Sequence, residues 1–122
     1  MTNAAFQSIF DDLRSTMLGA VTPHQHVAEE APGRMVLKTR TGDAQPASSA
    51  WFGMIEIKKS YVSYHLMPLY DQPELGADLS PDLLRRKQGK TCFNFKREDQ
   101  ALYLELAKLT ARAAEAVSPA SG

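Results

Sequence analysis

The segment WFGMIEIKKSYVSYHLM, residues 51–67, is the most informative part of the sequence. It contains two runs rich in aromatic and β-branched side chains, joined by the polar residues KKS. Runs of this kind favour two adjacent antiparallel strands, although the Asn-Gly turn preferred in tight hairpins is missing. Side chains alternate between the two faces of a strand, so the segment also predicts which residues point toward a core.

Two further strands are predicted on either side of this hairpin. The run RMVLKTRT, residues 34–41, places Met35 and Leu37 on one side and basic residues on the other, and KTCFNFK, residues 90–96, alternates about Phe93 and Phe95. Residues 21–33 contain two prolines and no sustained period, which predicts a connection with a short extended piece at its centre. The small, polar residues 42–50 predict a mobile surface loop.

Helices are predicted at both ends of the chain. Apolar residues at intervals of three and four predict a first helix beginning near Thr2 or Asn3, with an inward stripe formed by Phe6, Ile9, Phe10, Leu13 and Met17. A long helix from Glu98 has its own stripe, formed by Leu102, Leu106, Leu109, Ala113 and Val117. A third, short helix over PDLLRRKQ, residues 81–88, follows from Ser80-Pro81-Asp82, a favourable helix start, and Gly89 stops it.

These elements predict an α+β fold, in which a curved antiparallel β-sheet of about four strands has the N-terminal and C-terminal helices packed on one face. We expect a single domain over residues 1–122, with residues 118–122 as a frayed tail. Alternation assigns nine strand residues to the face under the helices: Met35, Leu37, Ile55, Ile57, Val62, Tyr64, Leu66, Phe93 and Phe95.

Composition excludes several classes of function. Fourteen basic and fourteen acidic residues give a formal net charge of zero, so we expect neither nucleic acid nor a membrane surface as a partner. The single cysteine excludes an internal disulfide and any multi-cysteine metal site. The N-terminal residues lack the pattern of a signal peptide and no run is long enough to cross a bilayer, so a cytoplasmic location is expected.

The opposite face of the sheet is the predicted functional surface. Alternation places on it both apolar residues and groups that can hydrogen-bond or titrate: Phe52, Met54, Glu56, Tyr61, His65, Met67, Cys92 and Asn94. Because apolar residues are unusually frequent on this face, we expect a non-enzymatic binding or self-association domain, with a homodimer or an unknown small ligand or protein as its partner. The competing interpretation is a half-solvated sheet with scattered apolar residues.

Catalysis is the weaker alternative. Cys92 could act as a thiol nucleophile if His65 lay within hydrogen-bond reach, although a lone cysteine between apolar residues more often serves packing. No glycine-rich phosphate loop, G-x-S-x-G elbow or H-E-x-x-H pair occurs in the sequence. The basic cluster of Arg85, Arg86, Lys87 and Lys90 could meet phosphate, but a solvated face that balances nearby acids is the preferred interpretation.

Several of these motifs together resemble one family. The run YVSYHLMPLY, the loop DQPELG, the block SPDLLRRKQGKTCFNF and the terminal LYLELAKLTARA are similar to the YdhG-like family of small bacterial proteins, over residues 34–116. The resemblance implies a cytosolic α+β domain with a curved antiparallel sheet. One branch of the family is described as frataxin-like and iron-binding, which makes iron the only cofactor to consider, carried by Asp71, Glu74, Asp78 and Asp82. These acids are spread along a loop, and solvated charge is the preferred interpretation.

Overall fold

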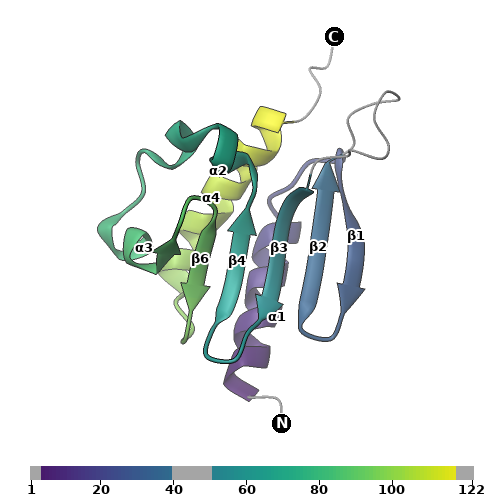
Figure 1. Ribbon diagram of the computed structural model, residues 1–122, viewed down its shortest axis with the longest axis vertical. Helices are drawn as coiled ribbons and strands as arrows, with labels where there is room; N and C mark the ends of the chain where they lie inside the picture. Colours follow the sequence, from purple (N-terminus) through teal and green to yellow (C-terminus); the bar gives the residue numbers. More distant parts are fainter. Residues whose placement is uncertain (1–3, 40–50, 118–122) are drawn as a thin grey trace.

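The computed structural model describes residues 4–39 and 51–117, in which two long helices cover one face of an antiparallel sheet (Figure 1). The predicted α+β fold is confirmed, but the sheet has six strands rather than about four. The covering helices are α1 (Ala4–Leu18) and α4 (Gln100–Val117). The strands are β1 (Gln25–Ala31), β2 (Arg34–Thr39), β3 (Trp51–Ile57), β4 (Val62–Leu66), β5 (Lys87–Gln88) and β6 (Cys92–Phe95).

The strand order explains how the chain builds the sheet. β1 to β4 form a meander in which each strand pairs with the next, and β6 then pairs with β4, so that the order is β1-β2-β3-β4-β6-β5. The crossover from β4 to β5 contains three short helices: α2 (Pro68–Asp71), η1 (Pro73–Gly76) and α3 (Pro81–Arg86). Three predicted features lie outside the described residues: the loop at residues 42–50, the helix start near Thr2 or Asn3, and the tail at residues 118–122.

β1 occupies the stretch that the sequence analysis assigned to a connection. Five consecutive residues of this edge strand, from Val27 to Ala31, are exposed, so the strand lacks the apolar alternation by which strands are recognised. Its register with β2 also shifts between Val27 and Glu29, which leaves Ala28 as an extra residue. The prediction of a connection was wrong because burial, and not backbone pairing, produces the sequence pattern.

The core lies between the sheet and the two long helices. It contains all nine predicted inward strand residues, of which Ile57 is only partly buried, and the apolar stripes of α1 and α4. The buried hydroxyl groups of Tyr64 on β4 and Thr110 on α4 share a hydrogen bond of 2.6 Å, which satisfies two polar groups that would otherwise be costly to bury. None of the helices in the described part of the chain combines the length and apolar character that a membrane crossing needs.

α1 approaches the sheet closely at Gly53. A Cβ atom at this position would lie 2.6 Å from the terminal methyl of Met17 and 3.1 Å from the carbonyl oxygen of His65. Met17 is fully buried, so a side chain at Gly53 would have to displace the end of the Met17 side chain and would press on the backbone of β4. Glycine therefore suits this close contact between α1 and the sheet.

Phe52 is a correction to the sequence analysis, which placed it on the face away from the helices. The register between β2 and β3 pairs Leu37 with Gly53 and Lys38 with Trp51, so Phe52 is an extra residue in β3. This β-bulge reverses the alternation beyond it. Phe52 is consequently 0% exposed and belongs to the core, whereas Trp51 is 45% exposed.

α3 is attached to α4 through its N-terminal cap. The backbone N–H and the hydroxyl of Ser80 both donate hydrogen bonds of 2.6 Å to the Glu105 carboxylate, and the Ser80 hydroxyl accepts one from the backbone N–H of Leu83. The sequence analysis extended this helix to Gln88, but it ends at Arg86. Lys87 and Gln88 instead pair with β6, so α3 is fixed at both ends.

Candidate functional site: the outer face of the sheet

The outer face is the side of the sheet that points away from α1 and α4. Its alternation is continuous across the strands, because the register places outward residues opposite one another in two neighbouring rows. The first row contains Glu29, Val36, Met54, His65, Cys92 and Gln88, and the second contains Ala31, Arg34, Glu56, Ser63 and Asn94. Five of the eight predicted site residues therefore share this face in adjacent positions.

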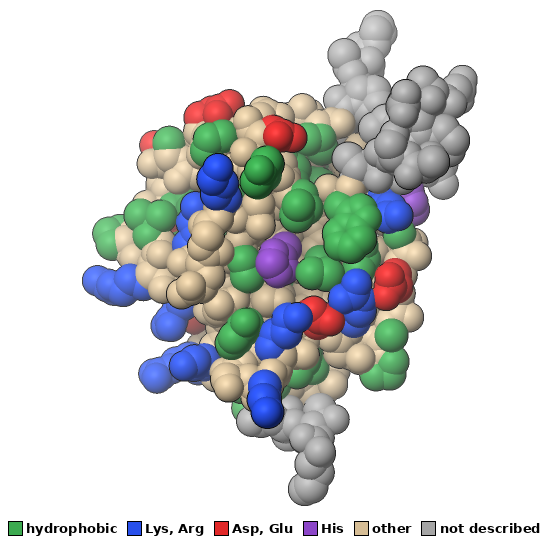
Figure 2. Space-filling view, in the orientation of Figure 1, with side chains coloured by type: hydrophobic (Ala, Val, Ile, Leu, Met, Phe, Trp, Pro, Cys, Tyr) green, Lys and Arg blue, Asp and Glu red, His purple; other side chains and the backbone are tan. Residues whose placement is uncertain are grey.

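Of the other three predicted residues, Phe52 belongs to the core, and Tyr61 and Met67 lie at the two ends of β4. Tyr61 precedes β4 and lines a pocket together with Asn94, and Met67 follows β4 and is half-buried. Figure 2 shows a histidine near the middle of this face, with hydrophobic side chains around it and Lys and Arg side chains along the side where α3 and β6 lie. The face thus has an apolar centre and a basic margin.

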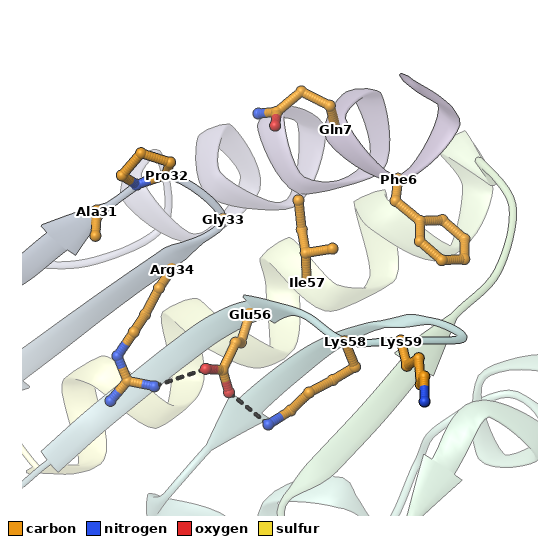
Figure 3. Close-up of a pocket in the computed structure, with 10 residues that line it drawn as sticks. All are labelled: Phe6, Gln7, Ala31, Pro32, Gly33, Arg34, Glu56, Ile57, Lys58 and Lys59. Atoms are coloured by element: carbon orange, nitrogen blue, oxygen red, sulfur yellow. Dashed lines mark hydrogen bonds and ion pairs between the residues drawn. The ribbon is translucent and has the colours of Figure 1, made fainter. Parts of the chain in front are cut away.

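Glu56 belongs to a chain of ion pairs at the turn end of the sheet. Its carboxylate lies 2.6 Å from Lys58 Nζ and 2.9 Å from Arg34 Nη1 (Figure 3). Arg34 Nε also lies 2.7 Å from the Glu29 carboxylate. The hydrogen bond from Lys58, followed by that from Arg34, lowers the pKa of Glu56. Arg34, Glu56 and Lys58 form part of the lining of a cavity of about 590 Å³, which Phe6 and Ile57 also line. A carboxylate held in this way is ionised and already accepts hydrogen bonds from two cations, so it is poorly suited to accept a proton.

His65 and Cys92 are directly opposite one another on β4 and β6, as the thiol hypothesis requires. Burial, followed by the charge of Lys58, lowers the pKa of His65, so the imidazole is neutral near pH 7. Burial raises the pKa of Cys92, and its thiol donates a hydrogen bond of 3.1 Å to Asn94 Oδ1. The arrangement holds the sulfur as a protonated thiol and does not activate it.

We expect the Cys92 thiol to react slowly with iodoacetamide. Because burial raises its pKa, less thiolate is present at pH 7 than in free cysteine, and the rate should rise with pH to an inflection above the ordinary value of about 8.5. The pH profile of the alkylation rate measures this, and His65→Ala should change the rate at pH 7 by less than about twofold. An inflection below 7 that His65→Ala abolishes would instead support the thiol-dependent enzyme.

The basic margin of the outer face contains a pocket of about 470 Å³. It is lined by residues of α3, β5 and β6 and by the residues just before β4 and just after β6: Tyr61, Arg85, Arg86, Gln88, Asn94 and Lys96. We call this the basic pocket. Arg85 forms an ion pair with Asp82 in which both side chains are more than two-thirds exposed, so water screens most of its effect. In the described part of the chain neither Arg86 nor Lys96 has an acidic partner.

Sequence reasoning missed the assembly of this pocket, although part of the signal was present. Alternation on β6 continues from Cys92 and Asn94 to Lys96, which places Lys96 on the outer face. Arg85 and Arg86 were recognised as a basic cluster, but their meeting with Tyr61 and Asn94 depends on the pairing of β5 with β6. A two-residue strand gives no periodic signal, so this contact could not be read from the sequence.

The four acids of the iron hypothesis are distributed over separate elements. Asp71 ends α2, Glu74 lies in η1, Asp78 lies in the loop that follows, and Asp82 lies in α3. Within residues 4–39 and 51–117, no three His, Cys, Asp or Glu side chains form a group that could hold a metal ion. Iron binding by these four acids stays a hypothesis taken from the family resemblance.

Comparison with known proteins adds no relative to this description. No family model, no curated protein and no solved structure matches the chain, so its resemblance to the YdhG-like family stays a hypothesis.

Proposed function

We propose that this chain is a non-enzymatic binding domain that receives an anionic partner on the outer face of its sheet. The observation that carries the proposal is the distribution of charge on that face. The two outward acids, Glu29 and Glu56, are neutralised by Arg34 and Lys58. In contrast, Lys38, Arg86 and Lys96 have no acid within ion-pair distance among the described residues.

A local excess of basic side chains is informative here because the whole chain has a formal net charge of zero. The positive potential is therefore a property of one surface and not of the molecule, and it is weak beyond about 8–10 Å at physiological ionic strength. Figure 2 shows Lys and Arg side chains gathered along one side of this face. Such a surface favours a ligand that makes direct contact over a polymer steered from a distance.

The titratable groups at the centre of the face support binding without catalysis. His65 and Cys92 both have their pKa values shifted toward the neutral form by burial, and Glu56 is ionised and paired. Covalent catalysis needs an activated nucleophile next to a proton acceptor, and these three residues do not form such a pair. A neutral, half-buried centre beside a basic margin is instead typical of a surface that holds a ligand with an apolar and an anionic part.

Titration of the ¹⁵N-labelled protein with an oligoglutamate peptide tests the proposal. We expect saturable shifts of amide signals from β3, β4 and β6 that weaken as salt is raised, because exposed ion pairs are screened. The double variant Lys38→Gln/Lys96→Gln should weaken binding, and the control Lys108→Gln/Arg112→Gln on the exposed side of α4 should not.

Light scattering of the same samples separates an anionic partner from self-association, which the apolar centre of the face could also support. The chain has a single tryptophan, Trp51, whose emission reports burial of the outer face. A monomer that binds the peptide supports the proposal. A dimer that shifts Trp51 emission to the blue and excludes the peptide contradicts it and indicates a second copy of this chain as the partner.

A further inference from the structure

The basic pocket contains more hydrogen-bond donors than a carboxylate can use. Arg86 supplies a planar guanidinium, Lys96 an ammonium, Tyr61 a hydroxyl, and Gln88 and Asn94 side-chain amides. A carboxylate has two oxygens, whereas a phosphate group has three or four and accepts from several directions at once. The composition of the lining therefore matches a tetrahedral oxyanion.

Asn94 has an orientation fixed by its neighbour. Its Oδ1 accepts the hydrogen bond from the Cys92 thiol at 3.1 Å, so the amide NH₂ is the end that remains for a ligand. An Asn side chain that was free to rotate could present its oxygen instead, which an anion would repel. Cys92 thus acts as a positioning residue for Asn94.

The backbone that carries the arginines of the pocket is held in place by the fold. α3 is attached to α4 through Ser80 and Glu105, and its C-terminal end leads directly into β5, which pairs with β6. The donors on α3 and those on β6 are consequently parts of one continuous framework. Preorganised donors bind an anion better than flexible ones, because less conformational freedom is lost.

From this arrangement we infer that the basic pocket is a phosphate-binding subsite, formed by Arg86, Lys96, Tyr61 and the Asn94 amide. The inference rests on the proposed function and specifies the anionic group that the outer face recognises. The ligand is a phosphate monoester whose phosphate group enters the pocket while the rest of the molecule remains outside it. Arg85 is not assigned to the subsite, because its guanidinium already contacts the Asp82 carboxylate and its side chain is largely exposed.

The test compares phenyl phosphate with benzoate by calorimetry and by ¹H–¹⁵N shifts, since the two ligands share a ring and differ in the anionic group. We expect phenyl phosphate to bind at least about fivefold more tightly, and Arg86→Gln and Lys96→Gln each to weaken it about tenfold or more, as expected for loss of a charge-assisted hydrogen bond. Lys108→Gln on α4 is the matched control and should leave binding unchanged. Denaturant midpoints of all variants show that they are folded.

Cys92→Ala distinguishes the proposed subsite from a surface that binds anions by charge alone. It removes the donor that orients Asn94 without changing any charge, so it should weaken phenyl phosphate several-fold, whereas a pocket that acts through charge alone would bind phenyl phosphate unchanged. Equal affinity for phenyl phosphate and benzoate, or an equal loss in Lys108→Gln, overturns the subsite. If oligoglutamate binds and phenyl phosphate does not, the inference fails alone; if neither binds, the proposed function fails as well.

Discussion

Replacing Phe52 by alanine should lower the free energy of unfolding by about 3–5 kcal/mol. The aromatic ring is 0% exposed and packs in the core beneath the helices, so its removal loses apolar burial and leaves a cavity that the surrounding side chains fill only in part. Chemical denaturation of the parent and the variant measures the difference. The effect is a direct test of the bulge between β2 and β3, because simple alternation places this residue in solvent.

Trp51→Ala is the matched control for this experiment. Trp51 is adjacent in the chain, is also aromatic and is larger, but it is 45% exposed on the outer face. Its removal should cost about 1 kcal/mol or less. If Trp51→Ala lowered the free energy of unfolding more than Phe52→Ala, the bulge would be misplaced and Trp51 would not belong to the outer face.

Leu106→Ala should cost about 2–5 kcal/mol, the usual range for a buried leucine that is truncated in a well-packed core. Leu106 is 0% exposed and lies on the side of α4 that faces the sheet. The helix itself is little affected, because alanine has the highest helix propensity, so the loss reports packing between α4 and the rest of the core. Thermal unfolding and denaturant titration both measure it.

Leu104→Ala makes the same chemical change two residues away on the same helix. Leu104 is 68% exposed, so the free energy of unfolding should change by about 0.5 kcal/mol or less. Equal losses at the two positions would mean that α4 does not pack with the predicted stripe inward.

The parts of the fold that could be predicted are those in which buried residues recur at regular intervals in the sequence. The stripe of Leu102, Leu106 and Leu109 identified α4, and the Ser80-Pro81 pair identified the start of α3. Both signals are local: one is set by the period of the helix and the other by the chemistry of its first turn.

The parts that could not be predicted depend on pairing between distant strands. An extra residue at Phe52 changes the face of Trp51, yet nothing in the local sequence marks the position as a bulge. β1 was missed because an exposed edge strand needs only backbone partners, and its side chains are free to be polar. In each case the information lies in the register of the sheet.

The candidate site divides in the same way. Alternation correctly grouped Met54, His65 and Cys92 on one face, because one period runs through β3, β4 and β6. It could not show that Arg86 reaches the Asn94 side of that face, since the intervening chain passes through α3 and a two-residue strand. The composition of the basic pocket is therefore a property of the crossover between β4 and β6.

The two outermost strands bear on how the protein behaves in concentrated solution. β1 ends the sheet with a shifted register and two neighbouring glutamates, Glu29 and Glu30, and β5 ends it after only two residues. Neither border offers the long, flat, uncharged template that recruits further chains into cross-β fibrils. A chain without net charge has little electrostatic protection from precipitation, and these blunted borders supply part of the protection that its charge does not.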